Sequence, residues 1–287
     1  MPKIIARILL AAVAYVVGVI LTGLFAPLLH LPAFKSIPGI APQHQIIAML
    51  LASPLLIVGL FPLSANLKGS RLQRCAALAA LIYVTLGLNT LIESKIFTNL
   101  VDGSPWWASL HYVLPATFVA LALTRRSEEP TKNISAEGNF GVTGWTWRIC
   151  LAWLAFPVIY FVFGMFVGPI VVRYYNSTGV LGLHIPSFAV IIRTQLLRSA
   201  IFLAASLPFL LMWTKSRARL VFALGLAHAM TVGIFQLAQA TFLPMAMRVA
   251  HGGEITCDSF AYAAVLAFLF TQAAKAVQPA VSKSAAA

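Results

Sequence analysis

The chain has 287 residues, of which 60% are hydrophobic and 9% are charged, and its mean hydropathy is +0.90. These values exclude an ordinary soluble domain and predict an all-α integral membrane protein. The formal net charge is +13. Because Lys and Arg are spread over the ends of apolar runs, this charge predicts contact with membrane lipids and no binding of nucleic acid.

Long apolar runs predict about eight transmembrane helices, since a helix needs about 20 mainly apolar residues to cross roughly 30 Å of hydrocarbon. The first run continues well beyond the apolar core of a signal peptide, so we expect it to remain as the first span. In chain order, the expected spans are Ile4–Leu29, Gln45–Ser64, Cys75–Phe97, Trp106–Leu123, Trp147–Val171, Phe188–Trp213, Leu220–Leu243 and Ile255–Ala274.

Positively charged residues are divided unevenly between the two sets of connections. The positive-inside rule predicts that the richer set is cytoplasmic, with both termini on that side. Compact connections without a soluble domain favour a bacterial-type cytoplasmic (inner) membrane. The richer set holds Lys3, Arg7, Lys68, Arg71, Arg74, Arg125, Arg126, Lys132, Lys215, Arg217, Arg219, Lys275 and Lys283, and the poorer set holds Lys35, Lys95, Arg173 and Arg248.

The two ends of the chain resemble each other in order, which predicts an internal repeat. The segment ARILLAAVAY resembles WRICLAWLAF, with Arg7 matched to Arg148 at 141 positions apart. Further on, Arg71 matches Arg217 at 146 positions apart. The pattern favours two parallel four-helix repeats related by an axis along the membrane normal. Chance similarity is the alternative, because Ala and Leu matches arise easily in membrane helices.

The repeat divides the chain into four regions. Residues 1–123 are expected to form the first four-helix half, and residues 145–277 the second. Residues 124–144 hold three of the seven acidic residues together with Pro, Gly and Ser, which predicts a flexible cytoplasmic linker. Residues 278–287 are expected to be a disordered tail.

Ionisable residues within apolar helices are costly and usually mark a pathway, a ligand or an internal pair. Arg193 and Arg198 lie on the sixth expected span, and Arg198 is about ten residues from its end, or roughly 15 Å. Such an arginine needs a partner. Glu254 and Asp258 begin the eighth expected span from the same side, so they are the candidate partners.

The segment RVAHGGEITCDSF carries the other candidates for a site. Arg248, His251, Glu254 and Asp258 follow steps of three and four, which places them on one face if the segment is helical. Gly252-Gly253 leaves the continuity of that helix open. The candidate ligand-binding residues are therefore Arg193, Arg198, Arg248, His251, Glu254 and Asp258.

Three interpretations of this cluster remain open. Arg198 and Glu254 form a buried ion pair that fixes the helix register. Alternatively, Arg193 and Arg198 bind an anionic group while Glu254, His251 or Asp258 handles a proton. In the third interpretation, His251 and Glu254 bind a metal, with Asp258 or His184 as a further ligand.

Other polar residues give weaker indications. His228 and His111 are the candidates for a haem pair, although a lone membrane histidine more often bonds a neighbouring helix. Thr85, Asn89 and Glu93 step by four along the third expected span and form a polar stripe. The three cysteines show no paired spacing, so no disulfide is expected, and no cofactor is predicted.

The motifs of soluble enzymes are missing from the sequence: it has no Walker loop, GxSxG elbow, HExxH or dinucleotide fingerprint. A duplicated helical bundle with charges inside it favours a transporter-like or ligand-binding membrane protein, with a small anionic or lipid-like ligand. The alternatives are a membrane-embedded enzyme acting on a lipid or lipid-linked substrate, and a structural subunit of a membrane complex.

Overall fold

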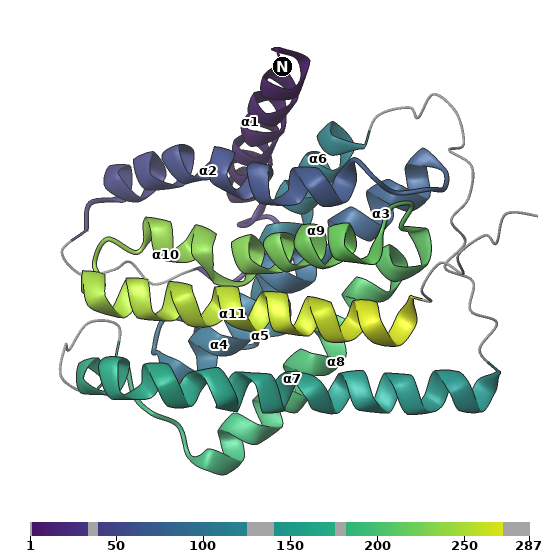
Figure 1. Ribbon diagram of the computed structural model, residues 1–287. Coiled ribbons are helices and arrows are strands. Elements are labelled where there is room, and N and C mark those ends of the chain that lie inside the picture. The colour runs from purple at the N-terminus through teal and green to yellow at the C-terminus, as the bar shows by residue number, and fades with distance from the viewer. Residues whose placement is uncertain (1, 34–39, 125–140, 176–181, 272–287) are drawn as a thin grey trace, which may run out of the picture.

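The computed structural model describes residues 2–33, 40–124, 141–175 and 182–271, and these residues form helices and no β-strand (Figure 1). In chain order the elements are α1 (Pro2–Phe25), α2 (Pro42–Ser64), α3 (Arg71–Ile82), the π-helix η1 (Tyr83–Leu88), α4 (Asn89–Phe97), α5 (Pro105–Ala108), the 3-10 helix η2 (Ser109–Tyr112), α6 (Val113–Leu123), α7 (Val142–Val171), the 3-10 helix η3 (Val172–Tyr174), α8 (Phe188–Met212), α9 (Arg217–Ala229), the π-helix η4 (Met230–Ile234), α10 (Phe235–Gln239) and α11 (Met245–Phe270).

These elements join into eight helices that are long and apolar enough to cross a membrane, counted over the described residues. The all-helical fold and the number of candidate spans are therefore confirmed. The largest departure is at α11, which begins at Met245 rather than near Ile255. Gly252 and Gly253 lie inside this continuous helix. Most of the expected linker and the whole expected tail fall outside the described residues.

Apolar side chains cover much of the outside of the bundle. On α7, Val158, Met165 and Phe166 are 62%, 69% and 72% exposed. A soluble monomer rarely exposes contiguous apolar surface on this scale, whereas lipid tails solvate it well. The exposure pattern therefore agrees with the membrane class indicated by helix length and composition.

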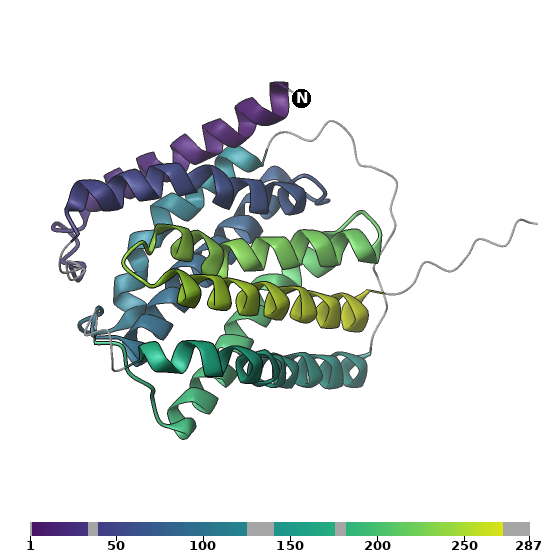
Figure 2. The same ribbon diagram turned by 60° about the vertical axis from the view of Figure 1, so that its left-hand side comes forward.

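The two halves, residues 2–124 and 141–271, use the same set of helix contacts. In the first half α1 packs against α6 and α2, and α3 packs against α6. In the second half α7 packs against α11 and α8, and α9 packs against α11. Across the halves, α2 contacts α9 and α8 contacts α3. Both views show α11 between α9 and α7, with α1 and α2 at the opposite edge of the bundle (Figures 1 and 2).

Where the halves meet, residues 146 positions apart contact each other. Leu67 and Trp213 form an isolated antiparallel bridge. The hydroxyls of Thr85 and Thr231, one in each π-helix, are 2.7 Å apart. Beyond them, the Gln236 side-chain amide donates to the Thr90 hydroxyl at 2.8 Å. The central seam of the bundle thus joins residues that are separated by one constant distance in the sequence.

The two ends of the bundle differ in their connections. The linker end holds Leu67 and Trp213, together with Thr124, which accepts a hydrogen bond from Arg71 Nε through its carbonyl at 2.8 Å. The loop end is the opposite end of the bundle, where the continuous helix Arg71–Phe97 ends at Phe97. A helix of this length covers about 40 Å at 1.5 Å per residue, enough to cross a bilayer.

Close approach of helix backbones depends on small residues, as is common in membrane bundles. Gly18 on α1 faces Pro115 on α6, and a Cβ at Gly18 would lie only 2.6 Å from Pro115 Cα. Gly23, further along the same helix, would place a Cβ with no atom within 4 Å. The two positions therefore separate the effect of packing from that of helix propensity.

We expect Gly18→Ala to lower the free energy of unfolding by about 1–3 kcal/mol, because the added methyl overpacks the contact between α1 and α6. Thermal unfolding of the detergent-purified protein measures the change. Gly23→Ala is the control and should be neutral or slightly stabilising, since Ala is the better helix former. Equal stability of the two variants would contradict this account of the packing.

Candidate functional site

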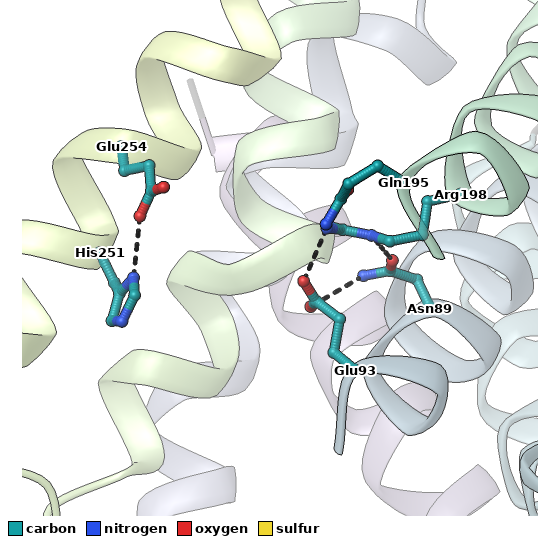
Figure 3. A network of polar contacts seen from close by, with 6 residues as sticks. All are labelled: Asn89, Glu93, Gln195, Arg198, His251 and Glu254. Atoms are coloured by element: carbon teal, nitrogen blue, oxygen red, sulfur yellow. Dashed lines mark hydrogen bonds and ion pairs between the residues drawn. The ribbon is translucent and has the colours of Figure 1, made fainter. Parts of the chain in front are cut away.

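Arg198 on α8 is buried within a hydrogen-bonded network that spans both halves (Figure 3). Its Nη1 lies 2.8 Å from Glu93 Oε1 and also donates to Gln195 Oε1 at 2.8 Å. Its Nε donates to Asn89 Oδ1 at 2.7 Å. Asn89 and Glu93 belong to α4 in the first half, so this ion pair ties α4 to α8.

The expected ion pair between Arg198 and Glu254 is replaced by two separate pairs. Arg198 bonds Glu93, and Glu254 lies 2.9 Å from His251 Nδ1, one turn earlier on α11. Figure 3 shows the two groups facing each other from different helices. The expectation failed because it sought the partner within the second half, whereas α8 packs against α4 of the first half.

A cavity of about 270 Å³, the charged cavity, lies between these two groups. Its walls come from α4 of the first half and from α7, α8, α9, η4, α10 and α11 of the second. The polar and charged residues lining it are Thr90, Glu93, Ser94, Thr98, Arg198, His228, Gln236, His251, Glu254, Asp258 and Ser259. Four of the six candidate residues thus meet at one cavity.

The other two candidates lie elsewhere. Arg193 is exposed and does not line the charged cavity. Arg248 is also outside it: Nε donates to the Leu237 carbonyl at 2.9 Å and Nη2 to the Ala238 carbonyl at 3.3 Å. Arg248 therefore satisfies carbonyls near the end of α10, where a cation is also favoured by the helix dipole.

Asp258 is the least satisfied member of the charged cavity. Asp258 is 7% exposed, and its Oδ1 has no hydrogen-bond partner among the described residues. Buried polar atoms are normally bonded, because desolvation without a partner is costly. Asp258 lines the cavity, so a molecule bound there is a candidate for the missing partner of its carboxyl group.

Aromatic rings form the remaining wall of the charged cavity. The guanidinium carbon of Arg198 lies 5.4 Å from the centroid of Phe156, 5.8 Å from that of Tyr160 and 5.5 Å from that of Phe202. At the floor, the His228 ring lies between Phe202 and Tyr262, with centroids 5.9 and 6.4 Å away. The inner end of the cavity is therefore lined mainly by aromatic rings.

Tyr175 follows directly after η3 and lines the charged cavity at the loop end. Burial raises the pKa of Tyr175 to about 12, and the carboxyl groups of Glu93 and Glu254 add to the rise. A neutral phenol is favoured there first because burial disfavours the phenolate, and then because a further negative charge is disfavoured near the two carboxyl groups.

The metal and haem interpretations receive no support from the described residues. No group of three or more His, Cys, Asp or Glu among them is placed to hold a metal ion. His184 bonds the Gly182 carbonyl through Nδ1 at 3.0 Å and does not line the charged cavity. His228 bonds the Ser206 hydroxyl at 3.1 Å, and His111 lines a different cavity, so they do not form a haem pair.

That different cavity, the neutral cavity, measures about 610 Å³ and lies between α1, α2, α6 and α10. It occupies the position in the first half that the charged cavity occupies in the second. At 146 positions apart, its Gln239 matches Glu93; when the ends of α6 and α11 are aligned, its His111 matches Asp258. No Asp, Glu, Lys or Arg of the described chain lines it.

Several residues of the charged cavity and of the Arg198 network beside it escaped the candidate set drawn from the sequence. Glu93 and Asn89 were seen only as a polar stripe, although their spacing of four already placed them on one helix face. Gln195 carried a signal of the same kind, three positions before Arg198. Nothing in the sequence marked the aromatic residues Tyr160 and Tyr262 as part of a site.

Comparisons with protein-family models, with curated proteins and with solved structures each found no match. The class of the protein is therefore defined by its own fold and site. Its described residues are all-helical with eight helices suited to crossing a membrane, and a charged cavity lies between the helices of the two halves.

The observed pairing of Arg198 with Glu93 predicts which pairs of charge-removing substitutions have non-additive effects on the free energy of unfolding. In double-mutant cycles, Arg198→Gln should couple to Glu93→Gln by about 1–3 kcal/mol, because each variant leaves the other partner buried and unpaired. Arg198→Gln and Glu254→Gln should couple more weakly. Thermal or denaturant unfolding in detergent measures both cycles, with the exposed Arg193→Gln as the control for losing a positive charge.

A coupling of Arg198 to Glu254 as large as its coupling to Glu93 would contradict the observed pairing. Equal costs for Arg193→Gln and Arg198→Gln would show that burial of the network contributes nothing to stability.

Proposed function

We propose that the protein is a transporter-like membrane carrier that binds a small polar ligand in the charged cavity. The observation that carries the proposal is the composition of the cavity wall. Helix α4 of the first half supplies Thr90, Glu93, Ser94 and Phe97, and α7, α8, α9, η4, α10 and α11 of the second half supply most of the other lining residues. In transporters built from repeats, the substrate site commonly lies between the halves, where a small rearrangement changes its access.

The contacts at the seam support a parallel duplication. Pairs 146 positions apart meet near the linker end, at mid-helix and towards the loop end. Like positions contact each other at successive levels only near an axis of two-fold rotation, and the proposed axis runs between the continuous helices Arg71–Phe97 and Arg217–Gln239. An axis along the spans is an axis along the membrane normal, as four-helix parallel repeats require.

The position of the cavity supports access from the loop end. Phe97, Thr98 and Tyr175, which end their helical segments there, line its mouth, and Tyr262 and His228 line its floor near mid-bundle. Below the floor, Phe209, Leu224 and Leu266 are fully buried. With both termini in the cytoplasm, as the positive-inside rule indicates, the cavity faces outward across the cytoplasmic membrane.

A membrane-embedded enzyme is the second candidate. It is favoured by the hydrogen bond of 2.9 Å between His251 and Glu254, which resembles an oriented acid–base pair beside an open cavity. An enzyme of this kind needs access for its substrate from one side only. A carrier must expose the same floor to both sides in turn, which separates the two functions experimentally.

We expect a cysteine at the cavity floor to react from both sides of the membrane. The variant Ser259→Cys is made in a background with Cys75, Cys150 and Cys257 replaced by Ala. Labelling with a membrane-impermeant thiosulfonate is measured in inside-out and right-side-out vesicles. Reaction in both preparations is the expected result, because a carrier alternates between two open states.

The control is Ser53→Cys, which is 2% exposed and lines neither cavity. It should remain unlabelled from either side. Labelling of Ser259→Cys from one side alone would favour the enzyme, and no labelling of it from either side would favour a purely structural role.

A further inference from the structure

We infer that the ligand of the charged cavity is a small organic cation, such as a primary or quaternary amine. The inference rests on the proposed binding role of the cavity and replaces the anionic ligand expected from the sequence. Three carboxyl groups line the cavity, those of Glu93, Glu254 and Asp258, against one guanidinium. Even with a protonated His251, the carboxylates outnumber the cationic side chains.

Arg198 is poorly placed to hold an anion. Its Nε and Nη1 are occupied by Asn89, Gln195 and Glu93. An incoming anion would have to replace Glu93 or lie among the carboxylates. The two other arginines that could have built an anion site, Arg193 and Arg248, do not line the cavity.

Asp258 supplies the independent sign of a missing partner. It is more than nine-tenths buried, it lines the cavity, and its Oδ1 lacks a hydrogen-bond donor among the described residues. An ammonium group presents donors and positive charge together, which satisfies both the hydrogen-bonding and the electrostatic demand of a buried carboxylate. Glu254, one turn away on α11, lies at the same wall.

The aromatic wall also favours an organic cation. The rings of Phe156, Tyr160 and Phe202 each lie within 6 Å of the Arg198 guanidinium carbon, which shows that this wall accommodates positive charge. A cavity of about 270 Å³ is far larger than a bare metal ion needs. The described residues also contain no group of ligands suited to one.

Thermal unfolding of the purified protein in lipid nanodiscs tests the inference with defined probes. The cations are ethylammonium and tetramethylammonium chloride, the neutral probe is tert-butanol and the anion is sodium pivalate, all compared at equal ionic strength. We expect at least one cation to raise the unfolding temperature saturably, whereas the neutral and anionic probes do not. Asp258→Asn should weaken the cation effect about tenfold or more.

The same variant separates binding from structure. Without ligand, Asp258→Asn should unfold at the same temperature as the wild type or higher, because it removes an unsatisfied buried carboxylate. Asp102→Asn is the matched control: it removes an exposed carboxylate that does not line the cavity, so cation binding should be unchanged.

Saturable stabilisation by pivalate without any effect of the cations would overturn the inference, and so would no effect of any probe. Cation binding that is equal in the wild type and in Asp258→Asn would remove Asp258 from the site and overturn its assignment. The carrier function is judged separately, by labelling of Ser259→Cys from the two sides of the membrane.

Discussion

The burial of Arg198 is the constraint on which the rest of the site depends. A guanidinium in the middle of an apolar bundle is unstable unless charge and hydrogen-bond acceptors surround it. Glu93 and Asn89 meet this demand from the first half, and Gln195 meets it from the same helix as Arg198. The network therefore fixes α4 against α8, and this placement forms one wall of the charged cavity. The opposite wall is α11, with His251, Glu254 and Asp258.

The two halves share helix contacts but differ in the chemistry of their cavities. Where the charged cavity has Glu93 and Asp258, the corresponding positions of the neutral cavity hold Gln239 and His111. Among the described residues the two cavities thus differ in charge although the halves share helix contacts, so the shared packing alone does not account for the charged residues.

The sequence was informative about the helices and much less so about the site. Apolar runs define spans because hydrocarbon thickness sets their length, and seven of the eight expected spans begin within a few residues of the observed helices. The eighth was expected to begin near Ile255, because Gly252-Gly253 reads locally as a break. In the bundle the turn around it packs against the neighbouring span: a Cβ at Gly252 would lie 3.4 Å from Ile234 Cδ1. Tertiary contact overrode local propensity there.

The partner of Arg198 was not predictable for a related reason. Helical periodicity places residues on a face but does not say which other helix that face meets. Four carboxylates within the described helices and loops were possible partners of Arg198. The stripe of Thr85, Asn89 and Glu93 gave the right face of its helix, but the sequence did not place this face against α8. Once Glu93 neutralises Arg198, the carboxylates of α11 are left without that cation, and the acidic excess of the charged cavity follows directly from the pairing.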